Sequence, residues 1–121
     1  RPGYTDLEIV WTVEMAKTST PRAAIPVSLA SVEAVIRAAA LKHGVDPDTF
    51  LRVARCESGL RPDAVNAASG AAGVMQFIPS TWAVNSVRAG YAGASVFNVE
   101  ANVMTAAWMF ANHQDWQWSC K

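Results

Sequence analysis

One carboxyl group in this 121-residue chain, that of Glu57, lies at a position that suits proton transfer. Glu57 ends an apolar segment and is followed at once by Ser58 and Gly59, which break a helix. A carboxyl group in that position can be half desolvated, and the negative end of the helix dipole further favours its protonated form. An acid that is still protonated near neutral pH can donate a proton to a leaving group. We therefore predict that Glu57 is a general acid.

Cleavage of a glycosidic bond needs such an acid, because the leaving oxygen must be protonated while positive charge develops on the sugar ring. Most glycosidases add a second carboxylate as nucleophile or base. None of the other acidic residues in the body of the chain lies in a motif that would identify it as this second carboxylate. These residues are Glu33, Asp46, Asp48, Asp63, Glu100 and Asp115. The pattern is that of a single acid.

A second segment follows after a loop rich in Ala, Ser and Gly: residues 73–82 read Gly-Val-Met-Gln-Phe-Ile-Pro-Ser-Thr-Trp. Gly73 permits close approach of the backbone to a ligand, and the amide of Gln76 offers donors and acceptors to hydroxyl and acetamide groups. By residue type alone, Met75 and Phe77 are better explained as core residues.

The two segments resemble the first two motifs of soluble lytic transglycosylases and goose-type lysozymes, which have Glu-Ser-Gly followed by Gly-Leu-Met-Gln and a downstream Trp. The sequence Cys-Glu-Ser-Gly at 56–59 and the Trp-rich end with a second cysteine are also similar to resuscitation-promoting-factor domains and phage lysins. The resemblance runs from about Ser31 to Cys120. It implies a mainly α, lysozyme-like domain of the α+β superfamily.

The resemblance also implies substrate-binding residues. Met75 and Gln76 would line the sugar groove near the acid, and Asn102 matches the Asn-containing helix of the family. Tyr91, in a Gly-flanked loop, is the aromatic residue that best fits a sugar contact, because sugar faces pack on flat rings. Ser58 either bonds the substrate or ends the helix by bonding backbone groups. The predicted set is Ser58, Gly73, Met75, Gln76, Tyr91 and Asn102.

Lytic transglycosylases need no second carboxylate, because the C6 hydroxyl of the substrate attacks the anomeric carbon and leaves a 1,6-anhydro product. The resemblance thus implies cleavage of the β-1,4 bond between N-acetylmuramic acid and N-acetylglucosamine in peptidoglycan, with Glu57 as acid and base and no metal or organic cofactor. The Ala-Tyr-Asn motif of many transglycosylases is missing, and residues 111–113 only faintly resemble it. A hydrolytic lysozyme and a non-catalytic glycan-binding or virion-structural module remain alternatives.

Composition argues against other classes of function. Ten basic and ten acidic residues cancel, and no cluster of Lys or Arg marks one predicted helical face, so nucleic acid is not an expected partner. The longest apolar stretch, around 34–41, is interrupted by Arg37 and falls far short of the roughly 20 residues that span a bilayer. We expect no membrane insertion, and we expect a monomer.

The two cysteines, Cys56 and Cys120, lack the spacing of zinc ligands. They either form a disulfide or are buried free thiols in a cytosolic protein. We favour the disulfide, which would tie the chain end to the helix that carries Glu57 and, through lost chain entropy, contribute about 4 kcal/mol. A disulfide implies an extracytoplasmic setting: secreted, associated with the cell wall, or in a phage lysin or virion.

Hydrophobic spacing predicts the helices that position Glu57. Residues 28–43 carry apolar side chains every three or four positions, which indicates one helical face, and Gly44 ends this helix. Asp46 and Pro47 then begin a helix that runs to Glu57, because an Asp caps free amides and Pro suits the first turn.

Two further helices are predicted beyond a loop at 66–73. One opens at Pro79, and the other covers 99–112 behind the capping residue Asn98. Toward the N-terminus, apolar residues alternate over 7–15, which predicts a short strand, and a Pro-containing connector follows. We therefore expect residues 1–26 to be a strand and connector, a possible remnant of an upstream module, and 27–121 to be the catalytic domain. The start at Arg1 indicates a fragment or processed form.

Overall fold

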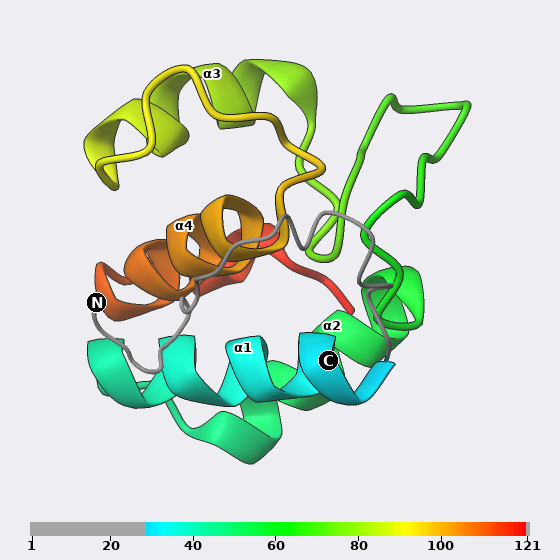
Figure 1. Cartoon of the computed structure of the whole chain (residues 1–121). Helices are drawn as coiled ribbons and strands as arrows, with labels where there is room; N and C mark the ends of the chain where they lie inside the picture. The colour runs from blue at the N-terminus through cyan, green and yellow to red at the C-terminus, as the bar shows by residue number, and fades with distance from the viewer. Residues whose placement is uncertain (1–28, 121) are drawn as a thin grey trace, which may run out of the picture.

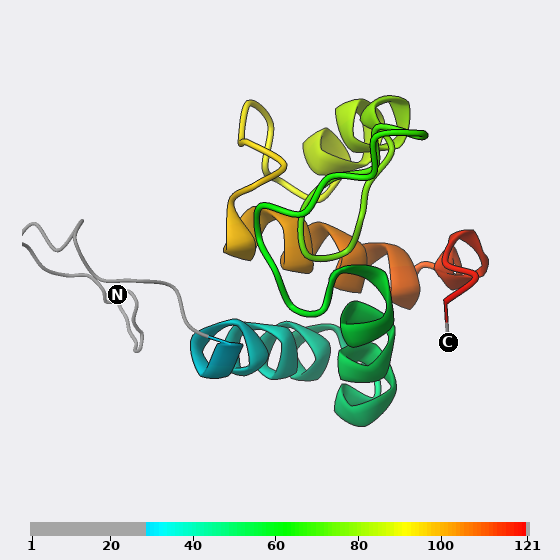
Figure 2. The ribbon, with the colours of Figure 1, turned by 90° about the vertical axis from the view of Figure 1, so that its right-hand side faces the viewer.

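The computed structural model describes residues 29–120, and its regular structure is helical. The elements are α1 (Leu29–His43), α2 (Pro47–Ser58), α3 (Pro79–Arg88), α4 (Val99–Ala111) and the short 3-10 helix η3 (Asp115–Gln117). In both views α4 lies between α3 on one side and α1 and α2 on the other (Figures 1 and 2). The strand predicted at 7–15 and the domain division near residue 26 lie outside the described residues.

Capping residues set the helix ends as the sequence predicts. The carboxylate of Asp46 accepts a hydrogen bond from the Thr49 backbone N–H at 3.0 Å, and Asn98 caps α4 through the Ala101 N–H at 2.9 Å. Gly59 ends α2 in the left-handed conformation with φ 66°. The mainly α prediction and the helix ends are therefore confirmed, the ends to within one residue. No helix within 29–120 has the length and apolar character to cross a membrane.

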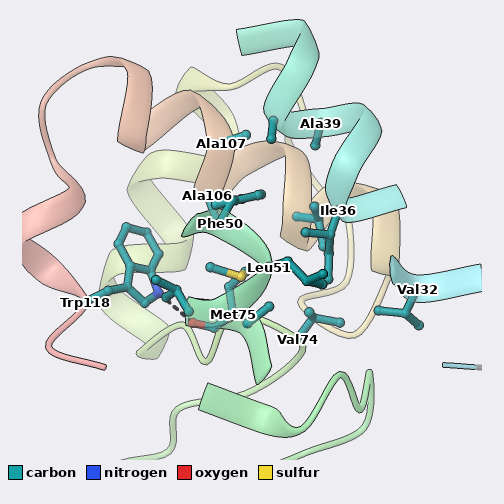
Figure 3. Close-up of a cluster of buried hydrophobic side chains, with 14 of the residues drawn as sticks. Val32, Ile36, Ala39, Phe50, Leu51, Val74, Met75, Ala106, Ala107 and Trp118 are labelled. Carbon is teal, nitrogen blue, oxygen red and sulfur yellow. Dashed lines mark hydrogen bonds between the residues drawn. The ribbon is translucent and has the colours of Figure 1, made fainter. Parts of the chain in front are cut away.

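The hydrophobic core forms where α1, α2 and α4 meet, and two non-helical segments complete it (Figure 3). Val74, Met75 and Phe77 enter it from the connection between α2 and α3, and Trp118 enters from the chain end. The helical members include Val32, Ile36, Ala39, Phe50, Leu51, Val53, Val103, Ala106, Ala107 and Met109. The core thus fixes the segment that follows Glu57 and the C-terminal tail against the same helices.

The connection between α2 and α3 contains a tight turn that is closed by paired backbone hydrogen bonds. Ala72 and Phe77 exchange two backbone hydrogen bonds of 3.0 and 2.9 Å around it. Within the turn Gly73 has φ 83° and Gln76 has φ 55°. Regular strands are absent from residues 29–120, where pairing is limited to isolated bridges of Ala72 with Val65 and with Phe77.

Gly73 is required because another part of the protein occupies the space that a side chain would need. A Cβ atom there would clash with the side-chain amide of Asn102 and lie 2.5 Å from the Val96 carbonyl oxygen. The sequence predicts close approach of a ligand at this glycine. The structure shows close approach of α4 and of the segment before it, so internal packing already requires a glycine here. Approach of a ligand stays a prediction.

Replacing Gly73 with Ala tests this packing against a matched control. Gly93→Ala has nearly the same φ, 82°, but its Cβ meets nothing within 4 Å. We expect Gly93→Ala to cost about 1–2 kcal/mol for the left-handed backbone and Gly73→Ala to cost about 1–3 kcal/mol more for overpacking. Chemical denaturation measures both, and equal losses would contradict the packing argument.

Candidate active site

Glu57 lies in the last turn of α2 and is half-buried. Burial raises the pKa of its carboxyl group, because the charged form loses hydration, and a hydrogen bond from the Cys120 backbone partly offsets this by lowering it. The predicted rise in the pKa of Glu57 is therefore confirmed in direction, with burial as its main cause. A raised pKa favours the protonated form of the carboxyl group, which is the form that a general acid uses.

The cationic side chains on either side of Glu57 in the sequence are engaged elsewhere. Arg55 pairs with Glu33 of α1 at 3.3 Å, and Arg61 donates to the Ser58 carbonyl oxygen at 3.0 Å. Within the described residues, the pKa of Glu57 is shifted by burial and by the Cys120 backbone, with no contribution from a cation. A permanent cation would hold the carboxyl group ionised, so the shift of Glu57 fits an acid.

The disulfide predicted from the sequence is present. Cys56 and Cys120 are bonded, with their Cα atoms 5.8 Å apart and a separation of 64 positions in the sequence. The bond joins the chain end to the residue immediately before Glu57, and in Figure 1 the red C-terminal segment runs back towards α2. The alternative of two free thiols is thereby excluded.

Asn102 of α4 is fully buried and holds the turn that follows Glu57. Its Oδ1 atom accepts from the Met75 N–H at 2.8 Å, and its amide nitrogen donates to the carbonyl oxygens of Val96 at 2.8 Å and Ala72 at 3.4 Å. On the other side of Met75, the Trp118 indole N–H donates to the Met75 carbonyl at 2.8 Å (Figure 3). Both polar backbone groups of Met75 are thus bound by side chains from distant segments.

Burial limits what several of the predicted binding residues can touch. The side chains of Met75 and Asn102 are 0% exposed, so a sugar has no surface of theirs to contact in this structure. The core role that residue type suggests for Met75 and Phe77 is confirmed. Direct contact of Met75, Asn102 or Gly73 with substrate stays a prediction, and what the structure shows is that they shape the turn.

Ser58 and Gln76 are also engaged within the protein. The hydroxyl of Ser58 donates to the Ala54 carbonyl at 3.4 Å and accepts from the Arg61 N–H at 3.2 Å, which are bonds that end a helix. The amide nitrogen of Gln76 donates to the carbonyl oxygens of Ala64 at 3.1 Å and Gly73 at 2.9 Å. Both hydrogens of that amide are used, so its oxygen is the atom left for a ligand hydroxyl.

Tyr91 lies in the connection between α3 and α4 and is half-buried. Its hydroxyl donates to the Glu100 carboxylate at 3.0 Å. Burial, together with the neighbouring Glu100 charge, raises the pKa of Tyr91 well above its ordinary range. Its ring is thereby held at one end by α4, and its contact with a sugar stays a prediction.

Among the described residues, two cavities near these elements are not lined by Glu57. A groove of about 550 Å³ runs between α1 and the start of α4, lined by Val35, Ala38, Ala39, Lys42, Asn98, Val99, Glu100 and Met104. A small cavity of about 40 Å³ beside the turn is lined by Gln76, Phe77, Ile78, Thr81, Gln117 and Trp118. Residues 29–120 contain no group of three or more His, Cys, Asp or Glu side chains that could hold a metal ion.

Comparison with known families now adds to this geometry. The family model described as Transglycosylase SLT domain matches residues 34–116, from the second turn of α1 to η3. The chain belongs to this family. Comparison with curated proteins and with solved structures gave no match. The helical fold is consistent with a lysozyme-like domain, and membership of the SLT family implies a lytic-transglycosylase type of activity on peptidoglycan.

Two features of the site had no readable signal in the sequence. Trp118 is 5% exposed and packs on the rings of Phe77 and Phe110, with centroids at 5.7 and 5.0 Å, although the tail around it has no helical or strand periodicity. The Cys120 backbone lowers the pKa of Glu57, and no pattern near residue 120 indicates this effect. The cysteine pair and the Trp-rich composition of the chain end indicated that the tail belongs to the folded domain, but neither indicated what the tail contacts.

Glu57→Gln tests the burial of the carboxyl group through stability. Because burial raises the folded-state pKa of Glu57, its contribution to stability is fully present below the unfolded-state pKa and is lost as pH rises through the folded-state pKa. A neutral amide avoids that loss. We expect Glu57→Gln to be more stable than the wild type at pH 7, and the difference to shrink as pH falls through the folded-state pKa.

Thermal melting at a series of pH values measures this effect. Glu33→Gln is the matched control, because Glu33 forms ion pairs with Arg37 and Arg55 at 3.3 Å and should gain no stability when its charge is removed. A stability difference for Glu57→Gln that does not change with pH would show a fully hydrated carboxyl group.

Proposed function

We propose that this SLT-family chain cleaves the β-1,4 bond between N-acetylmuramic acid and N-acetylglucosamine in peptidoglycan, as a lytic transglycosylase with Glu57 as its single general acid and base. The observation that carries the proposal is the half-buried Glu57, whose pKa is raised by burial and which no cation neutralises within residues 29–120. Membership of the SLT family supplies the substrate class.

The proposed reaction balances with one carboxyl group. Protonated Glu57 gives its proton to the bridging oxygen as the bond from that oxygen to C1 of the muramic acid breaks. The resulting Glu57 carboxylate then takes the proton of the C6 hydroxyl while that oxygen bonds to C1, which closes a 1,6-anhydro ring and restores the acid. Water is not consumed, and no metal or organic cofactor is required.

The other carboxylates support a single-acid mechanism, because several of them have structural partners. Glu33 and Asp48 pair with Arg37 at 3.3 and 3.0 Å. Asp46 caps α2 through Thr49, and Glu100 accepts from Tyr91. A general base or nucleophile must be free to reach the opposite face of the sugar ring. We therefore assign no second catalytic carboxylate.

The remaining predicted residues divide into two roles under this proposal. Gln76 and Tyr91 keep accessible surface and are proposed to contact the glycan, through an amide oxygen and a ring. Asn102, Met75 and Gly73 are proposed to hold the turn in shape, since their burial leaves little for a sugar to touch. Ser58, which is 5% exposed, is proposed to end α2 next to the acid. Little of its surface is available for contact with the substrate.

A cell-wall-acting domain with a disulfide suggests an extracytoplasmic location, since disulfides persist in oxidising compartments. Secretion by a bacterium and release as a phage lysin both fit this inference. Peptidoglycan glycan strands are the proposed partner, and the chain is proposed to act on them as a monomer.

The proposal predicts that Glu57→Gln keeps the fold but loses activity. We expect the rate of release of soluble fragments from purified cell walls to fall by at least about a hundredfold, the usual contribution of a general acid. Asp48→Asn is the matched control, because this carboxylate has a side chain 79% exposed and pairs with Arg37. Turnover by Glu57→Gln at the wild-type rate would remove the mechanism, and a wild-type chain that binds walls without cleaving them would indicate a binding module.

The product separates a lytic transglycosylase from a hydrolytic lysozyme. We expect mass spectrometry of the released muropeptides to show products one water lighter than those of a muramidase that digests the same walls, because the C6 hydroxyl attacks in place of water. Products with the same mass as those of the muramidase would indicate a hydrolytic lysozyme, in which Glu57 would still be the acid.

A further inference from the structure

The small cavity beside the turn is lined by two distant parts of the chain, the segment from the turn to the start of α3 and the C-terminal tail. Its volume is about 40 Å³, and its lining residues are Gln76, Phe77, Ile78, Thr81, Gln117 and Trp118. A buried water needs roughly 10–15 Å³, so the cavity has room for a group of a few atoms and not for a whole sugar ring. Ile78 and Gln117 are exposed, which places the cavity at the surface.

Part of this lining is apolar. The rings of Phe77 and Trp118 pack with their centroids 5.7 Å apart, and the two residues are 2% and 5% exposed. The indole N–H of Trp118 is taken by the Met75 carbonyl at 2.8 Å, so the Trp118 ring offers the cavity apolar surface. A methyl group suits such a wall, because removal of apolar surface from water is favourable.

The lining also contains hydrogen-bonding groups that the described part of the chain leaves free. Ile78 precedes α3 and provides no side-chain cap, so the Thr81 N–H in the first turn has no acceptor within residues 29–120. The Thr81 carbonyl accepts from the Asn85 amide at 3.0 Å, while its hydroxyl has no partner in the same range. The Gln76 amide nitrogen donates to two backbone carbonyls, which leaves its oxygen as an acceptor.

The charge of the lining indicates the kind of group that fits. Among the described residues, those that line the cavity carry no ionisable side chain, so a carboxylate would find no Lys or Arg there. A neutral group with an N–H, a carbonyl and a methyl matches the free acceptor, the free donors and the apolar wall at the same time. An acetamido group, which both sugars of peptidoglycan carry, has this combination.

We propose that this cavity receives the acetamido group of a peptidoglycan sugar. The Gln76 oxygen accepts from the acetamido N–H, Thr81 donates to the acetamido carbonyl, and the methyl group lies on the Trp118 ring. The inference rests on the proposed function and names a feature of the substrate that the chain selects. It also makes residues 117 and 118, which follow the end of the SLT match at 116, part of the substrate site.

The disulfide limits the distance between this cavity and Glu57. Cys120 lies two residues beyond Trp118 and is bonded to Cys56, which precedes Glu57. Because successive Cα atoms are about 3.8 Å apart and the disulfide Cα atoms are 5.8 Å apart, the Cα atoms of Trp118 and Glu57 lie within about 17 Å of each other. A glycan strand is a polymer, so a sugar beyond the cleaved bond can reach the cavity while that bond lies at Glu57.

Binding of a soluble glycan tests the site. In Glu57→Gln, which is expected to bind without cleaving, nuclear magnetic resonance follows the Thr81 amide and the Trp118 indole N–H as chitotetraose, an oligomer of N-acetylglucosamine, is added. We expect both signals to shift and the acetyl methyl protons to show nuclear Overhauser contacts with the Trp118 ring. Cellotetraose, which has a hydroxyl in place of each acetamido group, should produce neither effect. Signals that stay unshifted at millimolar chitotetraose would overturn the proposal.

A second experiment fills the cavity. Thr81→Leu, made in the Glu57→Gln chain, puts a larger side chain in the lining and removes the hydroxyl. We expect the affinity for chitotetraose to fall by about tenfold, because the acetamido group loses its place and at least one hydrogen bond. Ser80→Ala is the matched control, since it removes an exposed hydroxyl one position earlier that does not line the cavity.

Equal affinities of the two variants would also overturn the proposal. Circular dichroism checks that Thr81→Leu is folded, and the Overhauser contacts in the chain with Thr81 intact decide the question if it is not.

An anion is the alternative occupant, because the N-terminus of α3 favours negative charge. Sodium acetate has nearly the size of the acetamido group but is charged, whereas chitotetraose carries no carboxylate. At constant ionic strength, we expect the Thr81 amide to respond to chitotetraose and not to sodium acetate. The reverse result would assign the cavity to an anion and contradict the proposal.

These readouts separate the inference from the proposed function, because shifts on binding do not depend on wall cleavage. An inactive Glu57→Gln whose Thr81 amide is silent toward chitotetraose would contradict the acetamido site alone. A responding Thr81 amide in a Glu57→Gln chain that cleaves walls at the wild-type rate would contradict the acid role alone.

Discussion

The backbone of Met75 is the point at which the distant parts of this domain are joined. Its N–H is held by the side chain of Asn102 from α4, and its carbonyl is held by the indole of Trp118 from the chain end. Both bonds are buried, where an unpaired partner would cost about 1–3 kcal/mol. The turn between Ala72 and Phe77 therefore has one position relative to α4 and the tail.

Glu57 itself is subject to two opposed influences. Burial at the end of α2 raises its pKa, while the Cys120 backbone lowers it by stabilising the charged form. The nearby arginines, Arg55 and Arg61, are bound to Glu33 and to a backbone carbonyl and do not neutralise it. An acid in a transglycosylase must give up a proton and then take one back, and a raised pKa favours the protonated form that the first half of the proposed reaction needs.

The helices and the acid could be predicted from the sequence because their determinants are local. Capping by Asp46, Asn98 and Gly59 depends on bonds to residues within one turn, and the helix ends that were predicted therefore agree with the structure to within a residue. The position of Glu57 at a helix end follows from the same local signals. The residue type of Met75 likewise predicted its place in the core, whereas the contact with a sugar that the family resemblance implies stays a prediction.

What the sequence by itself determined is the helical framework, the placement of Glu57 at the end of a helix, and membership of a wall-cleaving family, because these depend on short patterns. What only the tertiary structure decided depends on contacts between distant residues: Asn102 lies 27 positions from Met75, and Trp118 lies 43 positions from it. The choice between a disulfide and free thiols was also open until Cys56 and Cys120 were seen bonded. Such pairings arise from the packing of the whole chain, which leaves no periodic pattern at either partner.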